Sequence, residues 1–243
     1  MRLTWLGHST VLVELDGIRL LTDPVLRSRV LHLRRSTPVD ERDIGRLDGV
    51  LVSHGHWDHL DLPSLRRVDQ GATVFVPRGL VPLLHGRRET MRAVVELNAG
   101  EEAELGPLRI NAVHAEHHAA RRRLHRSSAA LGYVVEGTRR VYFAGDTDLF
   151  SGMRELAPLD LALLPVAGWG PRLPAGHLDP KRAADALTFL CPRVAVPIHW
   201  GTYSVWRASR PDPSPAQEFA RAAADIAPDV EVRIPTHGVP IDL

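Results

Sequence analysis

The chain has little cysteine and no long hydrophobic run, and both absences restrict what it can be. Its one cysteine, Cys191, excludes an intrachain disulfide, and the sequence does not require an oxidising compartment. Cys191 follows a predicted helix end, which favours an inert buried thiol over a nucleophile. No apolar stretch approaches the length of a membrane span, and the first residues lack the pattern of a secretory signal. We therefore expect a soluble cytoplasmic protein without stable membrane insertion.

The chain also has little net charge and few aromatic residues. The net charge is only +1, so the chain as a whole offers no field that would attract nucleic acid or anionic membranes. Aromatic residues make up 5% of the chain, which leaves little for a membrane-interface belt. One local basic run, Arg121–Arg126, has two interpretations. A solvated face is the commoner one, and a surface that attracts phosphate is the other.

What is present is an ordinary globular composition in 243 residues, of which 44% are hydrophobic and 24% charged. No linker, repeat or low-complexity segment divides the chain, so we predict one α/β domain over residues 1–243. The strand patterns are Leu3–Leu6, Thr10–Leu15, Ile18–Thr22, Val50–Ser53, Thr73–Val76, Arg109–Val113, Leu131–Glu136, Arg139–Ala144, Leu161–Pro165 and Val194–Ile198. The helical patterns are Leu62–Val68, Gly79–His85, Asp179–Leu190 and Pro213–Ile226.

Turn and cap residues support several of these boundaries. Asp16–Gly17 tolerates the backbone of a tight hairpin turn. Asp61 and Asp179 precede helical patterns as N-caps, each followed by a proline near the first helical position. The two strand-rich halves, each with helices, favour two facing sheets with the helices packed outside them.

The segment Ser53–His59 carries the strongest chemical signal. It holds three imidazoles and a carboxylate within six residues, where the average frequency predicts about a third of a histidine. Neutral imidazole and carboxylate are ligands for zinc, manganese or iron, and no catalytic triad needs three histidines this close. His54 and His56 project to the same side of an extended backbone, whereas Asp58 and His59 follow as the chain turns. The segment therefore predicts metal binding, with two ions.

Further candidate ligands follow later strand patterns. A lone polar residue at a strand end is more often structural than a ligand, but four such strand ends in one chain reverse that expectation. The later candidates, each just after a strand pattern, are His114 or His117, Asp146 and His199.

These residues carry a resemblance to a known family. The HxHxDH motif at His54–His59, a later histidine, Gly145–Thr147 and His199 together resemble the metallo-β-lactamase superfamily over nearly the whole chain. The resemblance implies an αββα four-layer sandwich, with two facing mixed sheets, outer helices and a binuclear metal site between the sheets. Three further segments resemble the branch that contains N-acyl-phosphatidylethanolamine-hydrolysing phospholipase D and the L-ascorbate-6-phosphate lactonase-like proteins. They are Thr4–Thr10, Leu21–Pro24 and His177–Pro180.

The resemblance also implies a ligand set by position. The first two histidines of the motif and the later histidine would hold one ion. The last two donors of the motif and His199 would hold the other, with Asp146 as the bridge. The implied ligands are His54, His56, Asp58, His59, His117, Asp146 and His199.

The later histidine is chosen by register. Relatives usually carry Pro-Ala-x-His at this position, which favours His117 over His114, and His118 then belongs to a pocket wall or the surface. His8 and Asp23 are expected as hydrogen-bonded or structural partners, because a metal-bound histidine usually needs such a partner.

Two divalent ions about 3.5–4 Å apart can share a hydroxide and lower its pKa towards about 7. Zinc is the first expectation, and manganese or iron suit the same donors. We expect Asp58 to orient the attacking water. His177 either donates a proton to the leaving group, hydrogen-bonds a substrate oxyanion, or caps the helix that follows it. Trp169 on the same loop is a pocket wall or a packing residue.

The leading hypothesis is a hydrolase of phosphodiesters or similar small anionic esters, with a lactonase or cyclic-ester hydrolase as the alternative. A nucleic-acid processing nuclease would need an added domain and a basic face, and a redox protein would need a flavin partner domain. A non-catalytic binding module would be expected to have lost ligands, whereas all seven positions are filled. A small-molecule substrate is expected and no nucleic acid. The natural substrate and the oligomeric state stay open.

Overall fold

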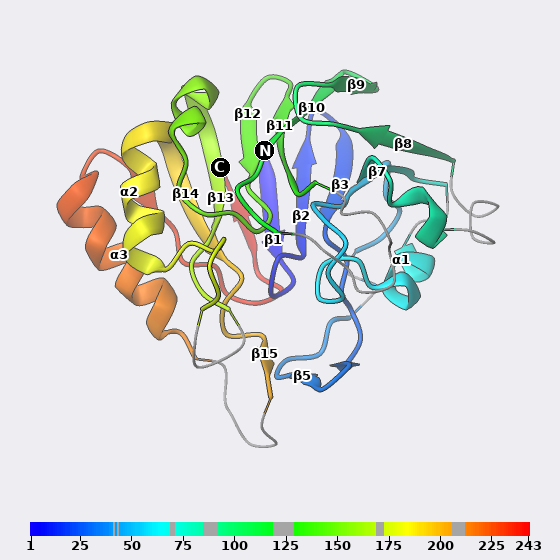
Figure 1. Ribbon diagram of the computed structural model, residues 1–243, viewed down its shortest axis with the longest axis horizontal. Coiled ribbons are helices and arrows are strands. Elements are labelled where there is room, and N and C mark those ends of the chain that lie inside the picture. Colours follow the sequence, from blue (N-terminus) through cyan, green and yellow to red (C-terminus); the bar gives the residue numbers. More distant parts are fainter. Residues whose placement is uncertain are drawn as a thin grey trace.

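The computed structural model describes residues 1–40, 42, 44–68, 71–84, 92–118, 129–168, 173–205 and 212–243. The basic run Arg121–Arg126 and Trp169 lie outside these ranges. Two seven-stranded sheets lie at the centre of the molecule, with helices on either side of the pair (Figure 1). A small three-stranded sheet lies beside them.

The first large sheet has the strand order β17-β1-β2-β3-β6-β7-β8. Its strands are β17 (Pro240–Asp242), β1 (Arg2–Trp5), β2 (Val11–Leu15), β3 (Ile18–Thr22), β6 (Gly49–Leu51), β7 (Thr73–Pro77) and β8 (Ala93–Leu97). Neighbours are antiparallel from β17 to β3 and parallel from β3 to β8, so the sheet is mixed.

The second large sheet has the order β16-β14-β13-β12-β11-β10-β9 and is mixed as well. Its strands are β16 (Glu231–Val232), β14 (Pro192–Ile198), β13 (Leu159–Pro165), β12 (Arg140–Phe143), β11 (Leu131–Glu136), β10 (Leu108–His114) and β9 (Glu102–Leu105). The small sheet joins β15 (Tyr203–Ser204), β5 (Leu33–Arg35) and β4 (Arg29–Val30).

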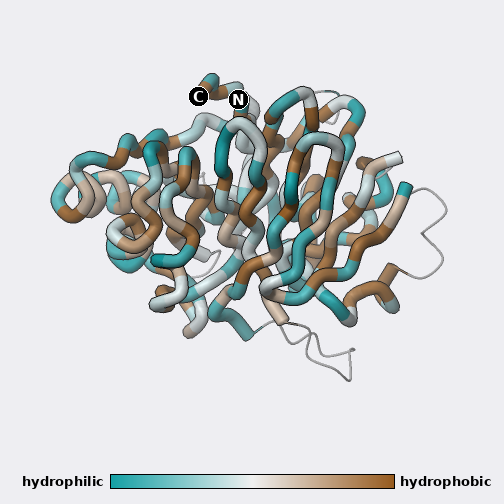
Figure 2. The backbone as a smooth tube through the Cα atoms, turned by 90° about the horizontal axis from the view of Figure 1, so that it is seen from above, coloured by the Kyte–Doolittle hydropathy of each residue, from teal (hydrophilic) through white to brown (hydrophobic). Residues whose placement is uncertain are grey.

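Alternation along the strands divides the apolar residues between two cores. In the first sheet, Leu51 and Phe75 belong to the cluster between the sheets, whereas Val50, Val74 and Val76 belong to the cluster under the outer helix. Figure 2 shows hydrophobic residues running through the strands and hydrophilic ones in the connecting turns. Burial on both faces explains why these strands read as apolar runs in the sequence.

Helices cover both outer faces. The helix α1 (Leu62–Val68) packs Leu65 and Val68 on the first sheet, together with the 3-10 turn η2 (Val81–Leu84). The helices α2 (Pro180–Leu190) and α3 (Ser214–Ile226) lie on the second sheet and contact each other, and η3 (Ser151–Leu156) contacts α2. None of the described helices is both long and apolar enough to cross a membrane.

The predicted caps and hairpin are confirmed. The carboxylate of Asp61 accepts the backbone N–H of Ser64 at 3.1 Å, and that of Asp179 accepts the backbone N–H of Arg182 at 2.8 Å. Asp16 and Gly17 have φ angles of 51° and 80°, which is the left-handed backbone of a tight two-residue hairpin. The predicted four-layer αββα sandwich is confirmed as well.

Three expectations from the sequence were incomplete or wrong. The segment Gly79–His85 forms only the 3-10 turn η2 in its described part. The edge strands β8 and β9 were not predicted, because their half-solvated residues lack a continuous apolar run. Cys191 is exposed rather than buried: it ends α2 with a left-handed backbone, φ 43°, which turns it out of the helix.

Candidate metal centre

The donor residues gather at one rim of the sandwich because each follows the carboxyl end of a strand. The loops that leave these strands all open on the same side, where the two sheets meet. The residues, with the strand before each, are His8 after β1, Asp23 after β3, His54 after β6, His117 after β10, Asp146 after β12 and His199 after β14. The predicted placement of donors at strand ends is confirmed.

One group of donors consists of His54, His56, His117 and Asp146, whose ligand atoms lie within 4.8 Å of one another. His54 Nε2 is 2.9 Å from His56 Nδ1, and His117 Nε2 is 3.2 Å from the same atom. His54 is fully buried and burial lowers its pKa well below the usual value, while burial lowers the pKa of His117 to about 4. These rings are therefore neutral, as metal ligands must be.

A second group consists of His8, Asp58, His59 and His199, again within 4.8 Å. His59 Nε2 is 3.2 Å from His199 Nε2, and His8 Nε2 is 3.1 Å from Asp58 Oδ2. Burial opposes the charged form of His59, but the carboxylates of Asp146 and Asp58 outweigh it and hold its pKa well above the usual value. Positive charge is thus favoured at this position.

Four of the rings are oriented by oxygen acceptors on their outer side. The Nδ1 atoms of His54, His59, His117 and His199 lie 2.9, 2.7, 2.8 and 2.6 Å from Ser53 Oγ, Asp23 Oδ2, Gly176 O and Ala167 O. A neutral ring so placed carries its proton on Nδ1, and its unprotonated Nε2 points to the shared centre. Burial lowers the pKa values of His54, His117 and His199, so three inward lone pairs repel one another beside the carboxylates, and a cation between them removes that repulsion.

Asp146 lies between the two groups. Its Oδ2 is 3.1 Å from His59 Nε2 and 3.8 Å from His54 Nε2, and its Oδ1 is 3.2 Å from His199 Nε2. Oδ1 is buried and accepts no hydrogen bond from the described residues. Burial raises the pKa of this carboxyl, but His199 and His59 outweigh burial and hold it well below the usual value. A buried, ionised oxygen without a donor fits a metal ligand.

Asp23 and Ser53 connect the two donor groups through hydrogen bonds on the outer side of the histidine rings. Asp23 is fully buried and accepts the backbone N–H of Ser53 at 2.7 Å and the Ser53 hydroxyl at 2.5 Å, besides facing His59. One carboxylate thus supports His59 directly and His54 through Ser53. The expectation that Asp23 is a hydrogen-bonded partner is confirmed.

The main chain is unusual at several of these positions. His8, Asp23 and His199 have positive φ angles of 55°, 31° and 63°, which non-glycine residues rarely adopt outside sites where the surroundings enforce them. Gly145, φ 61°, precedes Asp146 and touches the other sheet so closely that an added Cβ would lie 2.5 Å from Ser53 Cβ. No local sequence pattern indicates the positive φ angles of His8, Asp23 and His199.

The predicted alternatives separate clearly in space. His117 lies in the first group, whereas His114 and His118 are exposed, and His114 faces Glu116 at 3.3 Å. His177 does not cap α2, which Asp179 caps. Its Nε2 lies 3.3 Å from Asp146 Oδ2, and its side chain is 13% exposed.

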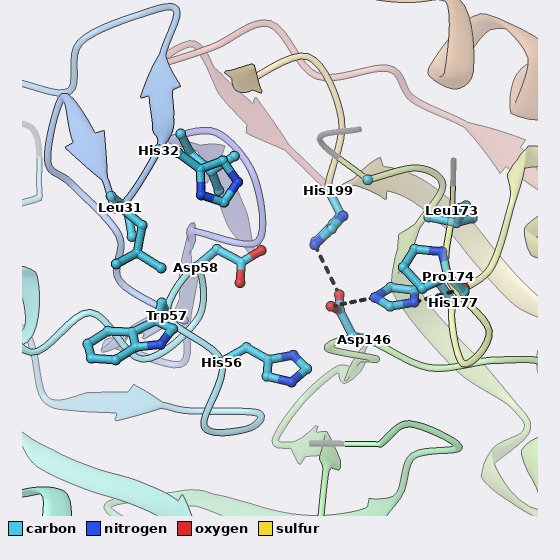
Figure 3. A pocket seen from close by; sticks show the side chains of 13 residues that line it. Leu31, His32, His56, Trp57, Asp58, Asp146, Leu173, Pro174, His177 and His199 are labelled. Atoms are coloured by element: carbon cyan, nitrogen blue, oxygen red, sulfur yellow. Dashed lines mark hydrogen bonds and ion pairs between the residues drawn. The ribbon is translucent and has the colours of Figure 1, made fainter. Parts of the chain in front are cut away.

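A cavity of about 290 Å³ opens above the donors. Figure 3 shows Leu31, His32 and Trp57 on one side and Leu173, Pro174 and His177 on the other, with Asp146 and His199 between them. The complete lining is Val30, Leu31, His32, Leu33, His56, Trp57, Asp58, Asp146, Gly168, Leu173, Pro174, His177 and His199. A small substrate can therefore reach both donor groups.

Residues 18–200 match the beta-lactamase superfamily domain, and the chain belongs to this superfamily. It is 35% identical over 242 residues to a UPF0173 metal-dependent hydrolase of Methanopyrus kandleri, covering 96% of each chain. It is 34% identical over 226 residues to N-acyl-phosphatidylethanolamine-hydrolyzing phospholipase D 1 of Caenorhabditis elegans, covering 82% of this chain. The match spans 64% of that relative's length.

A solved structure agrees with this assignment. Igni18, a novel metallo hydrolase from the archaeon Ignicoccus hospitalis, is similar with a TM-score of 0.73 and 26% identity, over 100% of this chain and 98% of that one. The family resemblance inferred from the motif is thereby confirmed.

Proposed function

We propose that the chain is a binuclear metal-dependent hydrolase that cleaves a phosphodiester or a similarly small anionic ester. The general class, a metal-dependent hydrolase, follows from the superfamily and from relatives of that name. The proposal of two ions depends on one observation: two four-residue donor groups lie side by side, and Asp146 reaches toward both. Imidazole and carboxylate donors suit zinc first, and manganese or iron as well.

The proposed ligands keep the positions expected from the motif. His54, His56 and His117 would hold one ion, Asp58, His59 and His199 the other, and Asp146 would contact both. His8 belongs to the second group, but its Nε2 faces Asp58 Oδ2, so its proposed role is to hold that carboxylate. Ions bound here would acidify a water molecule and neutralise charge that develops on a substrate oxygen.

Asp58 is the proposed acceptor for the proton of the attacking water. It lines the cavity, and His8 holds its Oδ2 at 3.1 Å. The neighbouring His59 and the hydrogen bond from His8 outweigh burial and hold the pKa of Asp58 well below its usual value. The carboxyl is therefore ionised, and it would orient the attacking water by accepting a hydrogen bond from it.

His177 is the proposed proton donor to the leaving group. Burial lowers its pKa, but the hydrogen bond to Asp146 and the charge of that carboxylate outweigh burial, so the pKa is raised. The ring lines the cavity on the side opposite Trp57, where a leaving oxygen can be reached (Figure 3). A raised pKa favours the protonated ring, which is the form that a general acid requires.

Phosphodiester chemistry is supported by the nematode relative, whose name is that of a phospholipase D. The test is metal content after purification without added metal, with hydrolysis of bis-p-nitrophenyl phosphate and of a simple lactone. We expect two metals per chain and diesterase activity that falls further in Asp58→Ala than in His177→Ala. Asp16→Asn is the control, because Asp16 lies in the hairpin turn between β2 and β3 and contacts Thr138.

Other outcomes separate the alternatives. Turnover of the lactone alone would replace the phosphodiesterase proposal with a lactonase. One metal or none, with neither substrate cleaved after metal is restored, would refute the binuclear hydrolase. Small and equal losses in Asp58→Ala and His177→Ala would refute the assigned roles of these two residues.

A further inference from the structure

The cavity above the donors is polar at its base and apolar at its mouth. The base consists of site residues such as Asp58, Asp146 and His199. The mouth consists of the turn between β4 and β5 with Leu31 at its apex, together with Trp57, and of Leu173 and Pro174 on the opposite side (Figure 3). None of the described lining residues is lysine or arginine.

Leu31 is placed where folding alone would not place a leucine. Its side chain is 59% exposed, and its φ of 51° is a left-handed conformation that is unfavourable for a non-glycine residue. Trp57, between two proposed ligands, is 40% exposed. Among the described residues only four large hydrophobic side chains are exposed, and these two flank the same cavity. Exposed apolar side chains beside a cavity, one of them on an unfavourable backbone, do not stabilise the fold and therefore point to contact with a ligand.

The turn that carries Leu31 is firmly held. Its strand β5 pairs with β15, which follows His199 closely in sequence. The guanidinium of Arg35 donates to the carbonyls of Leu6 at 2.7 Å and Val25 at 3.1 Å. Leu31 is therefore presented to the cavity by an anchored hairpin.

We propose that Leu31 and Trp57 form an apolar subsite that binds one compact alkyl or aryl group of the substrate. The inference rests on the proposed function, since it places the ester at the donors and the apolar group at the mouth. The cavity of about 290 Å³ receives the ester at its base and one apolar group at its mouth. With no cationic side chain among the described lining residues, the substrate's charge is confined to the ester. The substrate class is a monoanionic ester with one small apolar substituent.

Alkyl(methyl)phosphinates test this inference by binding alone. They are monoanions that mimic a phosphodiester head group but contain no ester bond, so only the alkyl chain varies along the series. Their affinity for the metal-loaded protein is measured by calorimetry with methyl, butyl and octyl chains. A fully buried methylene strengthens binding about fourfold, so we expect butyl to bind at least about tenfold more tightly than methyl. Octyl adds little, because its outer methylenes extend past Leu31 and Trp57 into water.

The variant Leu31→Asn removes the apolar contact and keeps a residue that tolerates the left-handed backbone. We expect it to reduce the preference for butyl to less than about threefold, without changing the affinity for dimethylphosphinate or the metal content. Val239→Asn is the matched control: Val239 is 51% exposed but does not line this cavity. It keeps the full preference.

Two results would overturn the subsite: equal affinity across the chain-length series, or an unchanged preference in Leu31→Asn. The hydrolase proposal fails separately. If the chain-length preference is present while bis-p-nitrophenyl phosphate and the lactone are not cleaved, the apolar subsite stands and the chemistry assigned to the donors falls.

Discussion

Replacing Asp23 by asparagine should weaken metal binding while leaving the fold in place. The carboxylate of Asp23 accepts the backbone N–H and the hydroxyl of Ser53, at 2.7 and 2.5 Å, and faces His59 Nδ1 at 2.7 Å. Asparagine has the same shape and tolerates the positive φ of 31° at this position, so the backbone need not move. It removes the charge and turns one acceptor into a donor.

The expected magnitude follows from the contacts. Loss of a partner behind a metal-binding histidine costs about 10–100-fold in metal affinity, or about 1.4–2.7 kcal/mol. The ion held by His59 should lose this full amount, because His59 contacts Asp23 directly. The ion held by His54 should lose less, because its contact runs through Ser53. Ser53→Ala should reverse that order, since it removes the hydroxyl that faces His54.

The measurement is a competition with a chromophoric chelator that resolves two dissociation constants, together with metal analysis of the purified protein. Asp16→Asn is the matched control. The carboxylate of Asp16 also accepts a backbone N–H and a hydroxyl, both from Thr138, but it lies in the hairpin turn and not at the donors. Two unchanged dissociation constants in Asp23→Asn, with both ions retained, would refute the argument that this carboxylate supports the centre.

Three further predictions concern the site and the fold beneath it. His117→Ala should lose one of two ions, whereas His114→Ala should keep both, because His114 is exposed and contacts Glu116. Metal analysis decides, and loss of an ion in His114→Ala with both ions kept in His117→Ala would move the ligand assignment to His114. Tyr133→Phe should lower the free energy of unfolding by about 1–3 kcal/mol, because the fully buried hydroxyl of Tyr133 donates to the carbonyl of Val52 at 2.9 Å. Urea unfolding measures this change, and an unchanged free energy would mean that water replaces the lost donor. The metal-free protein should lose stability as pH falls from about 6.5 towards 4. Burial lowers the pKa of His8 to about 3 and of His117 to about 4, so in this pH range the unfolded chain binds protons that the folded chain does not bind. Urea unfolding midpoints that rise on acidification would contradict this sign.

Local sequence signals predicted a large part of the fold. The strands Ile18–Thr22 and Leu131–Glu136 and the helix Leu62–Val68 have the predicted bounds, because apolar runs and cap residues mark both ends. The edge strands β8 and β9 were not predicted, because a strand with one solvated side shows no continuous apolar run. The hairpin of β4 and β5 was not predicted for a different reason: its strands are very short and contain arginine, and the third strand of their sheet, β15, is distant in sequence.

The convergence of the seven candidate ligands was predictable because their spacing is partly local and because strands end at a common rim. Their role as ligands stays a prediction. The approach of His8 to Asp58 was not predictable in this detail, since it depends on a left-handed backbone at His8 and on a contact between residues 50 positions apart. The mouth at Leu31 was missed for the same reason. Contacts of this kind arise from packing between elements, and no local pattern encodes them.

Gly145 has a consequence for how such a centre can change over time. Because the main chain at Gly145 touches Ser53 of the opposite sheet, and Leu131 N–H bonds to Ser53 O at 2.9 Å, backbone contacts hold the two strand ends at a fixed separation. A different ion, or a different side chain at one ligand position, must then be accommodated by rotation of side chains and not by the sheets moving apart. Any residue larger than glycine at position 145 would clash with Ser53 and force this contact apart. Reactivity can therefore diverge through the metal and the mouth of the cavity, while the separation of the two sheets that supply each donor group stays the same.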